Sequence, residues 1–320
     1  MKRMLPILLL LLLTASLGAS CSGAPLAAIT PSPSPVPTHT PVPTPVPVIA
    51  VVAPEDYACF WEGIETAGMD DGASVMPVAG GLASVPALSF SGASVILAYL
   101  EEPEPDYEPL RQAMQRGSYV YVYAANGQDV PEDIPALTYS SAGAAEASLD
   151  AAIAYPPHDT PVRLFGLFSD RGSAAHAAWS AAVEAGRVFV KATYYAAEAE
   201  TEFAAWLEDR LAKVYPGMLD GIYAETASLA VQATDALAAM GRTDIEVFAA
   251  EAGDAVLTKM LEYPGILVSA TGANPVRAGY MLRESAYAQL IGILPASREL
   301  LPRTFSSATL EMEWDTLRDS

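Results

Sequence analysis

The sequence is poor in positive charge. Its 320 residues include 17 lysines and arginines but 38 aspartates and glutamates, so the formal net charge at pH 7 is −21. A surface with this excess of negative charge repels the phosphate backbone of nucleic acids and the headgroups of anionic lipids. We therefore expect no nucleic-acid partner and no direct docking of the folded part on an anionic membrane.

Histidine and the common catalytic motifs are also scarce or missing. Only His158, in a proline-containing loop, and His176, in an alanine-rich helical stretch, lie outside the N-terminal segment. The chain has no G-x-S-x-G, no H-E-x-x-H and no P-loop, and its adjacent glycines in "VAGGLAS" lack the dinucleotide-binding fingerprint. We therefore expect a protein that is not an enzyme and that holds no cofactor and no metal ion.

The N-terminus has the pattern of an export signal. Lys2 and Arg3 precede an apolar run from Leu5 to Leu13, and small residues follow in "SLGASCSG". The run is too short for a permanent transmembrane helix. The sequence therefore predicts a signal peptide over residues 1–20.

Cys21 follows these small residues, and this stretch resembles the lipobox of bacterial lipoproteins, although Leu17 lies four residues before Cys21 instead of three. The resemblance implies cleavage before Cys21, a lipid on that cysteine, and a position on the outer face of the bacterial cytoplasmic membrane. Plain secretion with a free Cys21 is the alternative. Cys59 is the only other cysteine, so acylation of Cys21 leaves no intramolecular disulfide, and we expect Cys59 to be buried.

Residues 21–47 have the composition of a tether. From Pro25 to Pro47 the chain is rich in proline, threonine, serine and valine, and it contains no aspartate, glutamate, lysine or arginine. Such a segment favours the polyproline II conformation at about 3.1 Å per residue, which gives it a reach of about 70 Å. We therefore expect it to hold a domain that begins at Val48 away from the membrane.

The remaining residues alternate between apolar runs and amphipathic helical stretches. Continuous apolar runs of this kind are typical of parallel strands that are covered on both faces, and the alternation indicates an α/β fold built from βαβ units. Its length is typical of two lobes. The strand-like runs are 48–53, 73–78, 93–99, 118–124, 161–168, 186–194, 220–225, 245–251 and 265–271, and the clearest helical stretches are 173–186, 202–215 and 228–241.

Three stretches in this order resemble the type I periplasmic-binding-protein family, in its sugar-binding branch related to the cores of LacI-type repressors. They are "VIAVVAPEDYACFWEGIETAG", "PVRLFGLFSDRGSAAHAAWSAAVEAG" and "LDGIYAETASLAVQATDALAAMGRTDIEVFAAEAGD". The resemblance implies two Rossmann-like lobes with parallel sheets, joined by a three-crossing hinge. The first lobe is expected at 48–138 and 252–293 and the second at 139–251 and 294–320, with crossings near 139–142, 251–253 and 300–307. Ligands would lie between the carboxyl ends of the two sheets.

The resemblance also implies ligand-binding residues in the first lobe. Tyr57 falls where the family commonly has an aromatic residue that stacks on a sugar ring, and Asp56 precedes it. Trp61 is expected at the rim of the cleft. Helix capping by Tyr57 and a surface position for Trp61 are the alternatives. Where relatives carry an Asp-Arg pair after the fourth strand, this chain has "VYAANGQD", so Asn126 or Gln128 would have to substitute for it.

In the second lobe the implied ligand-binding residues are mostly acidic. Asp170 and Arg171 lie in the loop "FSDRGS", Glu225 follows "GIYA", and Glu251 takes the place of the family's hinge aspartate. Capping of a helix N-terminus is the alternative role for the acidic residues. Carboxylates of Asp56, Asp170, Glu225 and Glu251 in one cleft would suit a polar or cationic ligand.

The resemblance thus predicts a monomeric, lipid-anchored solute-binding protein of an ABC importer, whose small, sugar-like solute binds between two closing lobes. Two alternatives stay open at the level of sequence. The same lipoprotein could present its solute to a membrane receptor or kinase. It could also be a surface interaction protein whose cleft has lost its ligand.

Overall fold

The fold is described from a computed structural model of the chain. The structure describes residues 45–68, 72–101, 105–125, 129–155, 161–314 and 317. The predicted signal peptide, Cys21, most of the predicted tether and Asn126 lie outside these residues. Residues from Pro45 onward form one compact unit. Among the described residues, no helix combines the length and the apolar character needed to cross a membrane.

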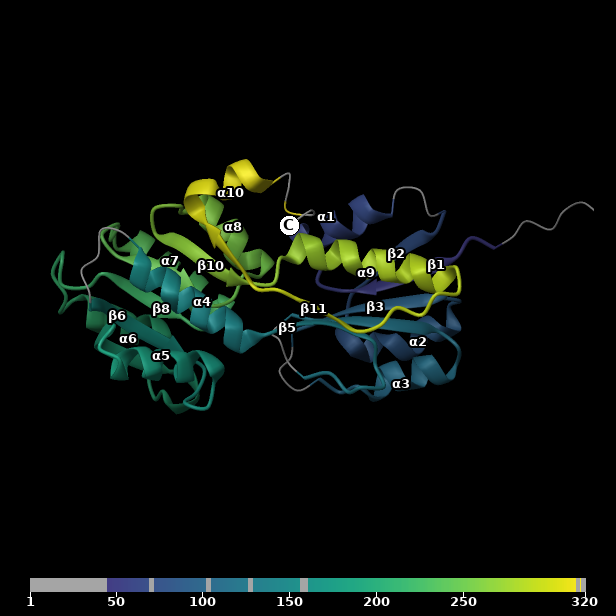
Figure 1. Cartoon of the computed structure of the whole chain (residues 1–320), viewed down its shortest axis with the longest axis horizontal. Coiled ribbons are helices and arrows are strands. Elements are labelled where there is room, and N and C mark those ends of the chain that lie inside the picture. The colour runs from purple at the N-terminus through teal and green to yellow at the C-terminus, as the bar shows by residue number, and fades with distance from the viewer. Residues whose placement is uncertain are drawn as a thin grey trace, which may run out of the picture. The chain divides into compact units, whose positions relative to one another are not determined.

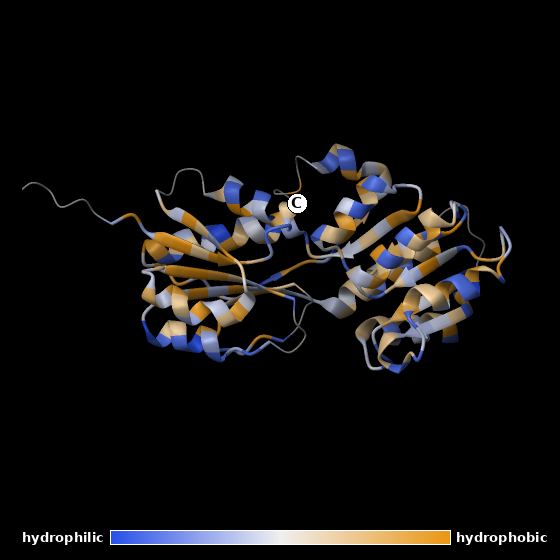
Figure 2. Ribbon diagram, turned by 180° about the vertical axis from the view of Figure 1, so that it is seen from behind, coloured by the Kyte–Doolittle hydropathy of each residue, from blue (hydrophilic) through white to orange (hydrophobic). Residues whose placement is uncertain are grey.

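The first lobe is built on a six-stranded sheet in which all strand pairs are parallel. Its central strands are continuous apolar runs that are buried on both faces, and they are mostly orange in Figure 2. The strand β2 carries Pro77, which an edge strand tolerates because one side of its backbone needs no partner. In spatial order the strands are β11 (Arg298–Leu300), β5 (Ala136–Tyr139), β4 (Tyr119–Ala124), β3 (Val95–Leu100), β1 (Val48–Val52) and β2 (Ser74–Val78).

The second lobe is built on another six-stranded sheet. Its pairs are parallel except that β12 runs antiparallel to β10, where the hydroxyls of Thr271 and Thr304 lie 2.9 Å apart. In spatial order the strands are β12 (Arg303–Ser306), β10 (Leu267–Gly272), β9 (Glu246–Ala249), β8 (Gly221–Ala224), β6 (Val162–Phe168) and β7 (Val188–Tyr195).

Helices cover both faces of the first sheet (Figure 1). On one face the core is formed with α1 and α9, and on the other with η1, α2 and α3. The bounds are α1 (Ala58–Ala67), α9 (Pro275–Leu290), η1 (Gly81–Ser84), α2 (Val85–Phe90) and α3 (Glu108–Gln115).

The second sheet is covered in the same way. One core cluster packs α4 and α5 on the sheet, and the other packs α6, α7, α8 and α10. The bounds are α4 (Ser141–Ala154), α5 (Ala174–Glu184), η2 (Ala196–Glu198), α6 (Phe203–Leu211), α7 (Ala227–Ala239), α8 (Asp254–Glu262) and α10 (Ser307–Glu313).

The helices α1 and α9, far apart in the sequence, lie side by side and touch through glycines (Figure 1). A Cβ atom on Gly63 would lie 2.0 Å from the carbonyl oxygen of Val276, and one on Gly279 would lie 2.1 Å from that of Phe60. Only glycine permits so close an approach of two helix backbones. The first lobe therefore depends on a helix that the chain reaches only after completing most of the second lobe.

The expected fold class is confirmed: two α/β lobes with mostly parallel sheets are joined by three crossings. The first crossing lies between β5 and α4 and the third between β11 and β12, as expected. The second was expected near 251–253 but lies between β10 and α9, because β10 pairs with β9 and β12 in the second sheet.

The expected lobe boundaries are therefore wrong in two places. Residues 252–272, expected in the first lobe, belong to the second, since α8 and β10 pack there. The strand β11, expected in the second lobe, pairs with β5 in the first sheet. Both errors arise because the order of elements is the same in either lobe, so the pattern of strands and helices does not reveal where the chain crosses.

Candidate functional site

A cavity of about 840 Å³ lies where the carboxyl ends of the two sheets meet, and both lobes contribute to its wall. This volume lies in the range of sites that bind small molecules. The first lobe contributes Tyr57, Glu101 and Tyr139. The second lobe contributes residues 141, 145, 169, 170, 173–175, 225–228, 231, 232, 250, 251 and 255.

Four strands end beside this cavity, and polar residues that follow them line it. Glu101 follows β3, Ser169 follows β6, Glu225 follows β8, and Glu251 comes two residues after β9. Carboxyl ends of parallel strands share one edge of a sheet, which is where α/β folds place ligands. The fold thus brings together acidic side chains that are far apart in the sequence.

Glu251 is the most deeply placed of these carboxylates. Its Oε2 atom accepts a hydrogen bond of 2.7 Å from the backbone N–H of Ala227, in the first turn of α7. Burial raises the pKa of the Glu251 carboxyl to about 7, the nearby Glu101 and Glu225 add to the rise, and the Ala227 N–H opposes it. The group therefore exchanges a proton near neutral pH.

Glu225 and Asp170 fix the loop between β6 and α5. The backbone N–H and the hydroxyl of Ser169 donate to Glu225 Oε2 at 2.6 and 2.8 Å. Asp170 Oδ1 accepts from the backbone N–H of Gly172, and Ser173 caps α5 by accepting from the backbone N–H of His176 at 3.1 Å. Both carboxylates thus have backbone or hydroxyl partners and still face the cavity.

Tyr57 forms the first-lobe side of the cavity together with Glu101. Its hydroxyl donates to Glu101 Oε1, and its ring meets that of Tyr99 edge to face at a centroid distance of 5.1 Å. Burial raises the pKa of Tyr57, and it also raises the pKa of Glu101, although the Tyr57 hydroxyl opposes the latter shift. Glu101 additionally lines a separate cavity of about 340 Å³ that lies within the first lobe.

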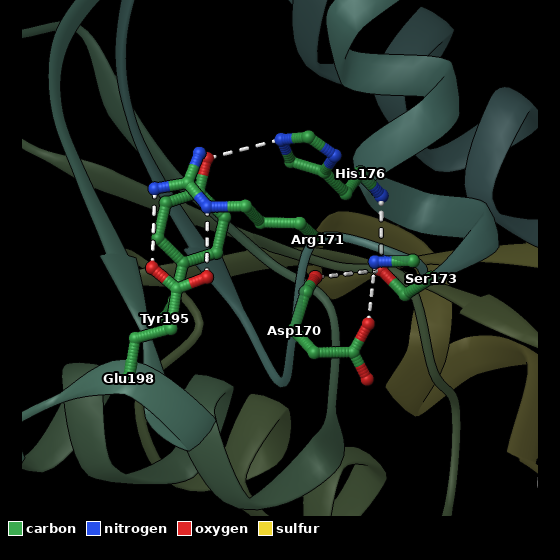
Figure 3. Close-up of polar contacts among 7 residues, drawn as sticks. Asp170, Arg171, Ser173, His176, Tyr195 and Glu198 are labelled. Carbon is green, nitrogen blue, oxygen red and sulfur yellow. Dashed lines mark hydrogen bonds and ion pairs between the residues drawn. The ribbon is translucent and has the colours of Figure 1, made fainter.

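Arg171 does not line the cavity, and Figure 3 shows its side chain paired with that of Glu198. Its guanidinium pairs with Glu198 at 2.7 Å and lies 4.0 Å from the ring centroid of Tyr195. The Tyr195 hydroxyl in turn lies 3.0 Å from Nε2 of His176. Both partners of Arg171 belong to the β7–η2 segment. This arginine therefore connects the loop before α5 to that segment and does not line the cavity.

The structure separates the sequence-predicted residues into two groups. Tyr57, Asp170, Glu225 and Glu251 line the cavity. Three others do not. Asp56 is exposed on the loop before α1, Arg171 is held by Glu198, and the indole N–H of Trp61 donates to the carbonyl oxygen of Pro54 at 2.8 Å.

Sequence reasoning missed Glu101, Tyr139 and Ser169. Each directly follows or ends a strand on the cavity side, so a search of the first polar residue after every apolar run would have found Glu101 and Ser169. Tyr139 ends β5, a strand of four residues that carries little periodic signal.

A buried carboxylate links the two lobes beside the cavity. Asp254, at the start of α8 in the second lobe, accepts hydrogen bonds from the backbone N–H groups of Cys59 and Phe60 in the first turn of α1. Burial raises the pKa of Asp254 to about 6, and these N–H groups oppose the rise. Cys59 is buried, as expected.

The carboxylates do not form a metal site within the described part of the chain, since no group of three or more His, Cys, Asp or Glu side chains there is suited to hold a metal ion. Several hydrogen-bond acceptors spread over a large wall are suited instead to an extended molecule with several donors.

No protein-family model matches the chain, and no curated protein is detectably similar in sequence. Solved structures do resemble it. A sugar ABC transporter protein from Yersinia enterocolitica subsp. enterocolitica is 18% identical, with a TM-score of 0.63 over 83% of this chain and 85% of that one.

Two further structures contain a named ligand. The 5-methylthioribose transporter solute-binding protein from Thermotoga lettingae, in complex with 5-methylthioribose, is 13% identical, with a TM-score of 0.61 over 83% of this chain and 88% of that one. The Caulobacter myo-inositol binding protein, bound to myo-inositol, is 15% identical, with a TM-score of 0.61 over 86% and 97%. The chain described here therefore has the fold of the type I periplasmic binding proteins.

Proposed function

We propose that the chain is an extracytoplasmic substrate-binding protein that delivers a small, polar, sugar-like solute to an ABC importer. The observation that carries this proposal is the interlobe cavity, which both sheets line with their carboxyl ends. The structural neighbours support it, because they are described as a sugar ABC transporter protein, a 5-methylthioribose transporter solute-binding protein and a myo-inositol binding protein.

The proposed solute-binding residues come from both lobes. Tyr57 and Glu101 contribute from the first lobe, and Asp170, Glu225 and Glu251 from the second. A carboxylate accepts hydrogen bonds from hydroxyl or ammonium groups, and a tyrosine ring covers the apolar face of a sugar-like ring. Asn126, after β4, stays a proposed contact that lies outside the described residues.

The proposed mechanism is a shift in the population of lobe arrangements. A solute that contacts Tyr57 and Glu251 at once binds most tightly when the lobes are closed, so it stabilises the closed state. The hinge that permits this motion consists of the three crossings, each only a few residues long. The permease would then recognise the closed, solute-loaded form.

We also propose that the protein is a monomeric lipoprotein on the outer face of the bacterial cytoplasmic membrane. The support is in the sequence: the export signal over 1–20, Cys21 after small residues, and the proline-rich tether over 21–47. A tether of about 70 Å would let an acidic domain reach a permease without approaching the lipid surface.

The test is a thermal-shift screen of the full chain, purified in detergent, against sugars, polyols and their amino derivatives. A solute at about 100 times its dissociation constant should raise the free energy of unfolding by about 2.7 kcal/mol. The Tyr57→Ala variant should lose this shift. Tyr215→Ala is the matched control, because Tyr215 is 74% exposed and does not line the cavity. No shift from any compound, in a protein that unfolds cooperatively, would contradict the proposal.

A further inference from the structure

The described lining of the cavity between the lobes carries negative charge without any cationic side chain. Four carboxylates line it, from Glu101, Asp170, Glu225 and Glu251, whereas the described lining residues include no lysine, arginine or histidine. Elsewhere several cationic side chains pair with acids, for example Arg111 with Asp133 at 2.7 Å. The described part of the chain shows no ion pair to Asp170, Glu225 or Glu251.

Arg171 is the cationic residue next to Asp170 in the sequence, but it does not neutralise the carboxylates of the cavity. Glu198 and the ring of Tyr195 hold its guanidinium outside the cavity wall (Figure 3). The pKa of the Glu251 carboxyl agrees with this arrangement. It is raised by burial and then by Glu101 and Glu225, and no cationic side chain is among the groups that lower it.

Helix N-termini offset only part of this charge. The first residues of α4, α5 and α7 line the cavity, and each N-terminus carries about half a positive charge. In each of these helices one first-turn N–H already donates to the capping side chain. Ser140 accepts from Gly143, Ser173 from His176, and Thr226 from Leu229, all at 3.3 Å or less. An anionic solute would therefore meet the carboxylates with little compensation.

The lining also limits what kind of cation fits. A metal ion is disfavoured, because no cluster of His, Cys, Asp and Glu among the described residues is suited to hold one. The wall also contains uncharged hydrogen-bonding groups, in Ser141, Ser169, Thr226 and Gln232, and the phenol rings of Tyr57 and Tyr139. Such a wall suits a molecule with several hydroxyl groups and a positive charge that an aromatic face and carboxylates share.

We propose that the solute is a hydroxylated organic cation, namely a sugar-like compound that carries a primary or secondary ammonium group, such as an amino sugar or an amino polyol. This inference rests on the solute-binding function proposed above and specifies its substrate class. Glu225 and Glu251 would receive the ammonium from the second lobe and Glu101 from the first, so that the charge of the solute itself draws the lobes together.

The test uses matched pairs of compounds that differ in one group: glucosamine with glucose, galactosamine with galactose, and glucamine with sorbitol. Binding to the full chain in detergent is measured by calorimetric titration near neutral pH. For at least one pair, we expect the ammonium compound to bind about tenfold or more tightly than its hydroxyl partner, since the positive charge adds a Coulomb attraction to the carboxylates that a hydroxyl group lacks. Its affinity should fall as NaCl rises, because salt screens charge pairs.

Two variants and a control locate the effect. Glu225→Gln and Glu251→Gln keep an acceptor oxygen for Ser169 and Ala227 but remove the charge, so each should reduce the ammonium preference by about tenfold. Glu184→Gln, at the exposed far end of α5 and about 15 Å along that helix from the cavity, should leave it unchanged.

The outcomes separate the two proposals. If the hydroxyl compounds bind as tightly as their ammonium partners, or more tightly, the inference about charge is overturned and the solute-binding function stands. If no member of any pair binds to a cooperatively folded protein, both proposals are overturned. A preference for the ammonium compound that survives in both cavity variants would also overturn the inference.

Discussion

The Glu251→Gln substitution should stabilise the free protein at alkaline pH. The folded protein raises the pKa of Glu251 from 4.5 to about 7, so the fold favours the protonated carboxyl. The favourable contribution is fully present below pH 4.5, and it is lost as pH rises through about 7. At higher pH the buried charge then costs about 3 kcal/mol of the free energy of unfolding. Glutamine cannot ionise, and its amide oxygen still accepts from Ala227.

The measurement is the unfolding temperature of the wild type and the variant from acid to alkaline pH, followed by circular dichroism. The two proteins should unfold at similar temperatures near pH 4.5, where both side chains are neutral. Above pH 7 the variant should unfold about 6 °C higher. The difference between the two curves isolates Glu251 from Asp254 and Glu101, whose own pKa values are also raised.

Glu184→Gln serves as the control, because this exposed side chain should change neither curve. If the wild-type and Glu251→Gln curves stay parallel across the whole range, then Glu251 does not ionise near neutral pH, and the description of a buried carboxylate with a raised pKa is wrong. A variant that is less stable at every pH would mean that the amide breaks the bond to Ala227.

Three further substitutions test other parts of the structure. Gly63→Ala should lower the free energy of unfolding by about 2–4 kcal/mol in urea titrations, since the added Cβ would overlap α9, whereas Gly265→Ala, with open space around it, should change it little. Asp254→Ala should speed hydrogen exchange at the Cys59 amide, because that N–H loses its acceptor across the lobes. Trp61→Phe should leave solute affinity unchanged, as measured by titration, and cost about 1 kcal/mol of stability through the lost bond to Pro54.

The strands that lie within long apolar runs were predictable, and three short strands outside such runs were not. Every strand-like run in the sequence became a strand, and the central ones are apolar throughout because both of their faces are buried. The missed strands β5, β11 and β12 have three or four residues each, and β11 and β12 lie at edges of their sheets. The strands β8 and β9 are equally short, but they lie within the longer apolar runs 220–225 and 245–251, whereas the missed strands lie outside the apolar runs of the sequence.

The candidate site was predicted in part for a similar reason. Glu225 and Glu251 could be found because each follows an obvious buried strand, and the cavity does lie at the ends of these strands. Trp61 and Arg171 could not be excluded from sequence, because their orientation depends on partners that are distant or irregular in conformation. Pro54 accepts the indole N–H, and Glu198 holds the guanidinium across the loop.

The exchange of segments between the lobes also determines when the protein can fold. The strand β11 pairs with residues about 160 positions earlier, and α9 packs on α1 across more than 200 positions, so the first lobe lacks a helix and an edge strand until the chain has been synthesised through Leu300. The sheet of the second lobe is likewise incomplete until β12 has been synthesised. Contacts so distant in sequence slow folding. A chain that crosses a membrane unfolded, N-terminus first, would therefore expose both incomplete cores on the far side until β11 and β12 arrive, and the two lobes should then fold as one event.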